Sequence, residues 1–318
     1  MNEDANSVFY VYGFTQAGTP GAAAAGMTQS NVSTAILSGE IDERHNSHAS
    51  HPSHRIPTAI LSGGIDESHP PFLRCNGTVA GVVSQVSRSE FCGPAGEKNL
   101  QDLAWLTARA CRHEAVLEQA MRLGPVLPTR FGTLFSSPAS LEGFLRRHEA
   151  AIARFLERLG TQQEWALKGF LDQGRAESEW LARRRSEKPG PSGSSPGVAY
   201  LQEQNLRLQA KQAIDDRLAA ACQGLLNELT PLASEIVPRR ILPRETPGPA
   251  REMVLNWALL LPAGAGADFR GRIERANAEH NPGGLAFDVS GPWPPYSFCP
   301  VLEGGASPGG GPGGGVEP

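Results

Sequence analysis

Residues Val8–Thr15, VFYVYGFT, predict the β-strand around which the fold is built. Every residue of this run except Gly13 is β-branched or aromatic, and these types pack well on a pleated surface. The run is short and is soon followed by Gly and Pro, which is typical of a buried strand. We therefore expect this strand to lie in the core of the first domain.

Two further segments are expected to be extended. Phe72–Ser87 carries four valines and predicts a second strand, with a turn at Asn76-Gly77 inside it. Pro125–Phe135, PVLPTRFGTLF, is an extended apolar segment whose one charged residue is Arg130. These segments lie on either side of a helical region.

Two helices are predicted from their capping residues and apolar spacing. The first begins near Asn99 and ends at Gly124, which is followed by a proline. The second begins at Ser137, where Ser is the cap and Pro138 the first helical residue, and ends at Gly160. Apolar residues recur along the second helix at helical spacing, so we expect one of its faces to be buried.

The second half of the chain again mixes strands with helices. A long helix is expected from Val198, and Pro231 should bend or end it. Apolar residues along it alternate in steps of four and three, a seam that could pack on another helix: Leu218, Cys222, Leu225, Leu229 and Leu232. The other predicted elements are strands at Glu164–Leu171, Met253–Leu261 and Leu285–Val289 and a helix at Asp268–Ala278.

Composition excludes several classes of protein. With 318 residues, of which 40% are hydrophobic, the chain can form two ordinary domains. A net charge of -4 lacks the basic excess of a nucleic-acid-binding surface. Five scattered cysteines fit neither a disulfide framework nor a zinc knuckle, and no apolar run is long enough to span a membrane. We expect a cytoplasmic protein with no nucleic-acid and no lipid-membrane partner.

A duplicated segment lengthens the loop after the first strand. Thr34–Glu43, TAILSGEIDE, recurs 24 positions later at Thr58–Glu67 as TAILSGGIDE. We interpret this as a local duplication within a loop insert, 16–70, of which one copy holds the native place. His45, His48, His51 and His54 lie between the copies, and we favour a solvated low-complexity insert over a metal site there.

Catalytic templates fit the sequence poorly. Gly193–Gly197 matches the nucleophile pattern G-x-S-x-G but lies in a stretch rich in Pro, Gly and Ser, 188–197, instead of between a strand and a helix. His113 and His148 lie in the same tetrapeptide, RHEA, yet neither continues to H-E-x-x-H. We expect each to hydrogen-bond across an interface and expect no catalytic residue, cofactor or metal. The alternative is a haem- or metal-dependent enzyme that uses His113 or His148.

An aromatic segment near the carboxyl end predicts recognition rather than chemistry. In GPWPPYSF, the prolines stiffen an extended chain that presents Trp293, Tyr296 and Phe298. Our hypothesis is that these side chains, with Arg130 and Phe131 of the extended segment 126–135, form or support a partner-binding surface. A rigid strand end that closes the domain is an equally good interpretation.

Six runs of residues, taken together, resemble the gas vesicle proteins of the GvpF/GvpL family. They occur in the family's order, and the resemblance covers about three quarters of the chain. The runs are YVYG (10–13), RHEAVL (112–117), PVLPTRFGT (125–133), EWALK (164–168), GVAYL (197–201) and GPWPPYSF (291–298).

This resemblance implies a non-enzymatic accessory or minor structural protein that is needed for gas vesicle assembly. The implied partners are the main shell protein and other vesicle proteins, and the implied location is the cytoplasm, in association with the vesicle. The implied fold is α+β with two domains, 1–160 and 161–302, the second one ferredoxin-like. The chain departs from the family in its insert, its flexible linker at 188–197 and its glycine-rich tail, 303–318, which we expect to be disordered. A third hypothesis is a helical adaptor that uses the leucine seam.

Overall fold

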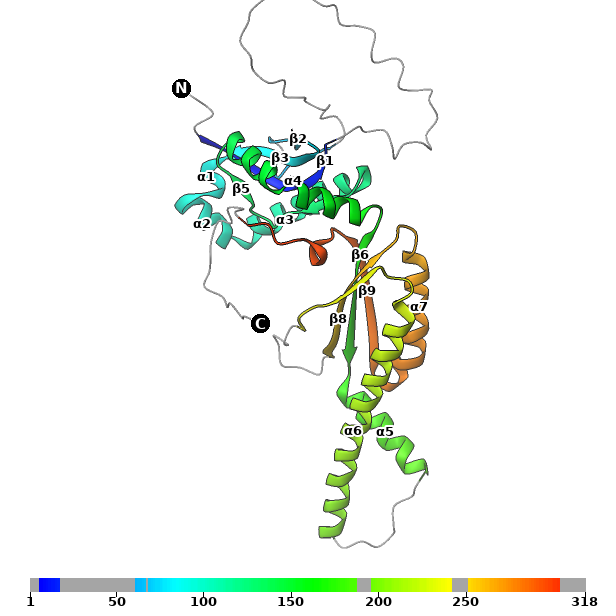
Figure 1. The fold of residues 1–318 in the computed structure, drawn as a ribbon. Helices are drawn as coiled ribbons and strands as arrows, with labels where there is room; N and C mark the ends of the chain where they lie inside the picture. The colour runs from blue at the N-terminus through cyan, green and yellow to red at the C-terminus, as the bar shows by residue number, and fades with distance from the viewer. Residues whose placement is uncertain (1–5, 18–60, 67, 188–195, 242–250, 304–318) are drawn as a thin grey trace, which may run out of the picture. The chain divides into compact units, whose positions relative to one another are not determined.

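The computed structural model describes residues 6–17, 61–66, 68–187, 196–241 and 251–303 (Figure 1). Helices and β-sheets are mixed, as predicted. Contacts divide the chain into two units, one formed by the residues up to Gly160 together with those after Trp293, and the other by Thr161–Trp293. Residues 294–302, which the sequence analysis assigned to the second domain, therefore group with the first unit.

The sheet of the first unit is antiparallel and is built around β1. Its strand order is β2-β3-β1-β4, and β5 also pairs with β1. β1 is buried over most of its length, and a register shift between Val11 and Gly13 marks a bulge. The Phe72–Ser87 run is a hairpin of two strands that turns after Asn76, as the turn signal indicated. The strands are β1 Ser7–Gln16, β2 Phe72–Asn76, β3 Val79–Ser87, β4 Val126–Pro128 and β5 Leu134–Phe135.

Two long helices pack against this sheet. Val116 and Leu117 of α3 share a core with Tyr10 and Tyr12 of β1. Phe144 of α4 packs on two other aromatic rings of the sheet, with centroid distances of 5.6 Å to Phe14 and 5.2 Å to Phe135. The helices of this unit are α1 Arg88–Phe91, α2 Gly93–Gln101, α3 Leu103–Leu123, α4 Pro138–Leu159 and the short 3-10 helix η4 Tyr296–Phe298.

The helix caps confirm one prediction and correct another. Ser137 caps α4 in a reciprocal capping box with Ser140, and Pro138 is the first helical residue, as predicted. The cap predicted at Asn99 is wrong: a break after α2 separates it from α3, and the carboxylate of Asp102 accepts from the first backbone N–H groups of α3. Aspartate is as good a cap as asparagine, so the two positions compete in the sequence.

The second unit has a four-stranded antiparallel sheet in the order β7-β8-β6-β9. The sequence analysis missed β7, because four residues with a terminal proline carry too little periodicity to detect. The strands are β6 Gln163–Leu171, β7 Glu235–Pro238, β8 Glu252–Leu261 and β9 Leu285–Trp293. The helices are α5 Gln173–Glu187, α6 Pro196–Leu229, α7 Gly266–His280 and the 3-10 helix η3 Asn281–Gly283.

The leucine seam of α6 lies in the core of its own unit. Leu225 and Leu229 are buried, and Leu218 and Leu232 pack partly buried against the same cluster, which includes side chains of β6, β8 and α7. The seam therefore packs mainly within its own unit, which argues against the adaptor hypothesis that relied on it. The predicted end of the helix before Pro231 is confirmed.

Several predictions fall on parts of the chain that the structure does not describe. They concern residues 18–60, which include the four clustered histidines, the linker residues 188–195 and the tail 304–318. Their predicted properties stay predictions. Within the described ranges, none of the helices has the length and apolar character needed to cross a membrane.

Candidate functional site

Four of the six sequence motifs meet around one buried histidine of the first unit. His113 of α3 is 1% exposed. Its Nδ1 lies 2.9 Å from the hydroxyl of Tyr10, and its Nε2 lies 3.3 Å from the hydroxyl of Tyr296. The Tyr10 hydroxyl also accepts a hydrogen bond from the backbone N–H of Gly132. The strand YVYG, the helix RHEA, the segment TRFGT and the carboxyl-terminal PPYSF are thereby joined at one point.

Aromatic rings enclose this histidine. Tyr12 lies with its ring centroid 5.6 Å from that of His113, and Phe131 lies 6.0 Å away in an edge-on arrangement. Tyr10 packs edge-on against Tyr12 at 5.0 Å. Such contacts add to area burial and hold each ring in one orientation. The cluster is a rigid junction between strand, helix and carboxyl-terminal segment.

The electrostatics of this junction favour neutral groups. Burial lowers the pKa of His113 to about 4, so that its imidazole is uncharged at neutral pH. Burial, followed by the nearby carboxylate of Glu114, raises the pKa of Tyr296 well above its usual range. The Tyr296 hydroxyl donates to Oε1 of Glu114 at 2.8 Å, and burial raises the pKa of that carboxyl.

The two RHEA histidines have different surroundings. Both ring nitrogens of His113 lie against tyrosine hydroxyls, as described above. Nε2 of His148 lies 2.8 Å from the backbone oxygen of Glu303, and its ring packs on Phe144 at 4.5 Å. Among the described residues, no three His, Cys, Asp or Glu side chains gather as metal ligands. The contacts of both histidines are those of structural residues that link separate segments.

The five predicted partner-binding residues are divided between the units. In the first unit, Arg130 is exposed and Phe131 is half-buried against the His113 junction. Tyr296 is 36% exposed, whereas Phe298 is only 5% exposed and can support a surface but not form its outer face. Trp293 belongs to the second unit, where it is 42% exposed and donates from Nε1 to Oγ of Ser290 at 3.1 Å.

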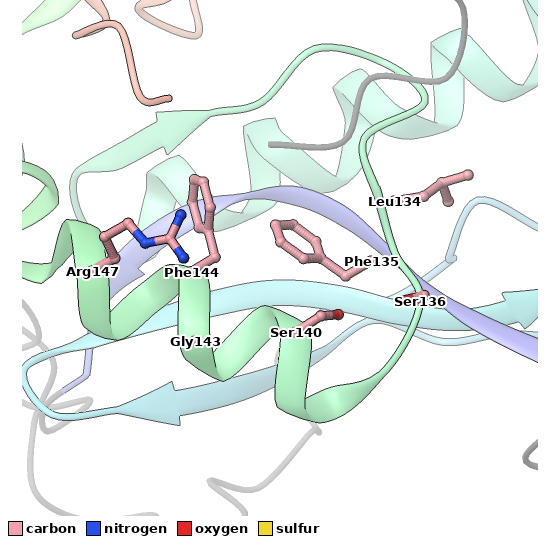
Figure 2. A pocket seen from close by; sticks show the side chains of 7 residues that line it. All are labelled: Leu134, Phe135, Ser136, Ser140, Gly143, Phe144 and Arg147. Atoms are coloured by element: carbon pink, nitrogen blue, oxygen red, sulfur yellow. The ribbon is translucent and has the colours of Figure 1, made fainter. Parts of the chain in front are cut away.

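A groove of about 340 Å³ lies on the first unit beside the end of the predicted segment 126–135. Figure 2 shows the ring of Phe135 facing that of Phe144, with the side chain of Arg147 extending beside Phe144. The groove thus combines an aromatic floor with one cation at its rim. Its lining residues are Leu134, Phe135, Ser136, Ser140, Gly143, Phe144 and Arg147.

Several large apolar side chains of the second unit are exposed near the start of α6. Val198, Leu201 and Leu208 share one side of the helix, because at about 100° per residue the three side chains lie within about 80° of one another around its axis. This side faces away from Ala210 and Ile214, which are buried in the core. Leu208 is 70% exposed. Figure 1 shows this part of α6 extending beyond the sheet of its own unit.

The family model for the gas vesicle synthesis protein GvpL/GvpF matches residues 8–300 of this chain. The chain belongs to the GvpL/GvpF family. The resemblance inferred from the six motifs is confirmed. The matched range includes the His113 junction, the groove and the exposed side of α6, so all three are parts of a gas vesicle family fold.

Curated relatives carry gas vesicle names. The chain is 28% identical to gas vesicle protein L of a Streptomyces species over 238 residues, which cover 74% of this chain and 85% of that protein. It is 25% identical to gas vesicle protein L1 of Halobacterium salinarum over 215 residues, covering 64% and 74% of the two chains.

Two crystal structures of GvpF share the fold. The GvpF of Anabaena sp. PCC7120 superimposes with a TM-score of 0.57 at 18% identity, covering 93% of this chain and 97% of that one. The GvpF of Microcystis aeruginosa gives the same TM-score at 16% identity, covering 92% and 99%.

The exposed side of α6 and the groove were not predicted from the sequence. GVAYL was noticed as a motif, but the apolar period along α6 was assigned to the buried seam further on. A second apolar stripe on the same helix could have been found by plotting 198, 201 and 208 apart from the seam. No sequence motif marks the groove, because it forms only when β5 and α4 pack together.

Proposed function

We propose that this chain is a non-enzymatic accessory or minor structural protein of gas vesicle assembly, which binds the main shell protein and other vesicle proteins. Family membership and the names of its relatives support a role at the gas vesicle. A shell that excludes liquid water needs a strongly apolar inner face, so its subunits would expose apolar surface before assembly. A partner that offers apolar contacts can hold them without any chemistry.

The exposed side of α6 is the observation that carries this proposal. Val198, Leu201 and Leu208 are large, apolar and accessible, and Tyr200 lies exposed beside them. Isolated apolar residues on a surface need no explanation. Several apolar residues on the same face of a helix, over successive turns, form a stripe that can contact a partner. The α6 stripe, residues 198, 201 and 208, is our first candidate for the contact with the shell protein.

The predicted surface of Arg130, Phe131, Trp293, Tyr296 and Phe298 remains a second part of the proposal. Arg130, Phe131 and Tyr296 would contact a partner from the first unit, with Phe298 as their support. Trp293 would act from the second unit. A partner that engages both regions would gain affinity from each of them.

We also infer that the second unit is a ferredoxin-like domain. The inference is supported by its element order, in which β6 is followed by helices, two strands, α7 and β9. It is also supported by the sheet order β7-β8-β6-β9, which is that of a split βαβ motif with antiparallel strands.

The α6 stripe is tested by capture of the purified main shell protein on immobilised full-length chain. We expect the double variant Leu201→Asp, Leu208→Asp to reduce capture about tenfold or more, because two desolvated apolar contacts are replaced by charges. The matched control is Gln202→Asp, Gln204→Asp, which adds the same charge to exposed positions of the same helix. Equal capture by both variants would exclude the stripe.

The aromatic part is tested separately in the same assay. Trp293→Ala and Tyr296→Ala are made singly, because the two side chains belong to different units. A loss of capture with either variant, at an unchanged melting temperature, would support that residue as a contact. Undiminished capture by the folded double variant would remove both of them from the proposal.

The assembly role itself is tested in the native host. Deletion of the gene should abolish or deform gas vesicles in electron micrographs, and the wild-type gene should restore them. Normal vesicles in the deletion strain, without a second family member to replace the protein, would contradict the role.

A further inference from the structure

The duplication extends two residues past the ten-residue run Thr34–Glu43 and its counterpart Thr58–Glu67. Thr34–His45 and Thr58–His69 match over twelve positions, and the two copies differ at only two of them. Glu40 stands where the second copy has Gly64, and Arg44 stands where it has Ser68. The structure describes the second copy from Leu61 onward, except residue 67.

The second copy is held in the core of the first unit. Ile65 is fully buried, and its backbone N–H donates to the hydroxyl of Tyr12 at 2.6 Å. Gln119 of α3 binds Ser62 from both ends of its amide: Oε1 accepts from the Ser62 backbone N–H at 2.8 Å, and Nε2 donates to the Ser62 carbonyl at 3.0 Å. A side-chain amide thus pairs with this segment as a neighbouring strand would.

The end of the copy is held equally firmly. Oδ1 of Asp66 accepts from the backbone N–H groups of Ser68 and His69 at 2.8 and 2.9 Å. The His69 carbonyl accepts from Oγ of Ser84 at 2.8 Å, and Ser84 also contacts the Tyr12 hydroxyl at 2.9 Å. The segment therefore closes a polar ring through Tyr12, Ser84 and its own backbone.

Gly64 leaves no space for a side chain in this arrangement. A Cβ placed on it would overlap the carbonyl oxygen of His69, and the carbon of the same carbonyl would be 2.8 Å away. The obstacle is backbone that the Ser84 hydroxyl holds in place, so a rotamer change cannot relieve it. Gly63, in contrast, has a positive φ of 67° but open space around it, and the first copy retains glycine there as Gly39.

We propose that Tyr12, Ser84 and Gln119 form an internal peptide-recognition site that accepts the second copy of the duplicated segment and rejects the first. The discriminating residue is Glu40 in the place of Gly64. The other residues whose side chains hold the bound copy are unchanged in the first copy, where they are Leu37, Ser38, Ile41, Asp42 and His45. Arg44 replaces Ser68, which is exposed and contributes only its backbone N–H. One substitution therefore prevents two otherwise matching segments from competing for one site.

Hydrogen exchange of the full chain, followed by mass spectrometry, tests this directly. In the wild type, the peptide that contains Ile65 should exchange much more slowly than the peptide that contains Ile41. Gly64→Glu should remove the protection at Ile65 and lower the melting temperature by on the order of 10 °C. The exchanged pair Glu40→Gly, Gly64→Glu should move the protection to Ile41 and recover part of the lost melting temperature.

Recovery should be partial, because the exchanged pair must close a longer loop between the bound copy and β2. Glu40→Gly alone and Gly64→Ala keep the test valid if Gly64→Glu does not fold. Glu40→Gly should fold and give Ile41 measurable protection, and Gly64→Ala should speed exchange at Ile65. Two results would overturn the proposal: equal protection of both copies in the wild type, or an exchanged pair no more stable than Gly64→Glu.

Discussion

The hydroxyl of Tyr10 and Nδ1 of His113 lie 2.9 Å apart, although 103 positions separate these residues in the chain. Tyr10 accepts from Gly132 and can donate to Nδ1, which leaves the proton of the neutral imidazole on Nε2. Nε2 can then donate to Tyr296, whose own proton goes to Glu114. In the tautomer with its proton on Nε2, these contacts form a directed chain of hydrogen bonds from the central strand to the carboxyl-terminal segment.

Acid should weaken the first unit through His113. The pKa of this residue falls from 6.5 in the unfolded chain to about 4 when folded, so the unfolded state binds the proton more readily between these values. The free energy of unfolding should decrease by about 3 kcal/mol as the pH drops from 6.5 to 4. Urea unfolding at several pH values measures this decrease.

His113→Gln isolates the contribution of His113 from that of Glu114. Burial raises the pKa of Glu114, so that carboxyl favours the folded state at low pH and opposes it as the pH rises. The variant should be less stable at neutral pH but lose little more on acidification. A wild-type acid response in His113→Gln would show that other groups cause it.

Tyr10→Phe should destabilise the first unit by about 1–3 kcal/mol, because it leaves Nδ1 of His113 and the N–H of Gly132 without their partner. The ring and its packing are retained, so the loss measures the hydroxyl. Tyr200→Phe removes an exposed hydroxyl and should change the stability by less than about 0.5 kcal/mol. Equal effects of the two substitutions in denaturant unfolding would contradict the role of the hydrogen-bond chain.

Gly13→Ala should be destabilising by about 1–3 kcal/mol. Its Cβ would lie 2.8 Å from the backbone oxygen of Leu127, which belongs to the neighbouring strand β4. Gly224→Ala is the matched control, because a Cβ there meets open space within α6. That substitution should stabilise the second unit by about 0.5–1 kcal/mol, the difference in helix propensity. Thermal unfolding of both variants should give shifts of opposite sign.

Leu229→Ala and Leu208→Ala should differ strongly, although both remove a leucine from α6. Leu229 is fully buried in the core of the second unit, and its truncation should cost about 2–5 kcal/mol. Leu208 is exposed, and its truncation should change the stability by less than about 0.5 kcal/mol. A large loss with Leu208→Ala in calorimetry would mean that the α6 stripe serves the fold rather than a partner.

The elements with strong local signals could be predicted from the sequence. The strand VFYVYGFT, the hairpin turn after Asn76 and the helix that begins at Ser137 each contain their own boundary signals. The break before Asp102 and the strand β7 could not be found in this way. Asn99 and Asp102 are both good capping residues, so the sequence does not decide between them. The four residues of β7 are too few to show a strand period.

The motifs could be recognised in the sequence, but their roles could not. RHEA occurs twice with the same letters, yet His113 is buried between two tyrosines while His148 packs on Phe144 near the surface. Trp293 and Tyr296 are three residues apart and belong to different units.

Local spacing and composition were enough to predict most of the helices and strands, and the letters of the chain alone show the duplication and the motifs that resemble the family. Burial, the neutral state of His113, the exposed side of α6 and the preference for Gly64 arise only when distant segments pack together. The physical reason is that desolvation and steric overlap depend on neighbours in space. Such neighbours can be far apart in the chain: 53 positions separate Tyr12 from Ile65, and 183 separate His113 from Tyr296.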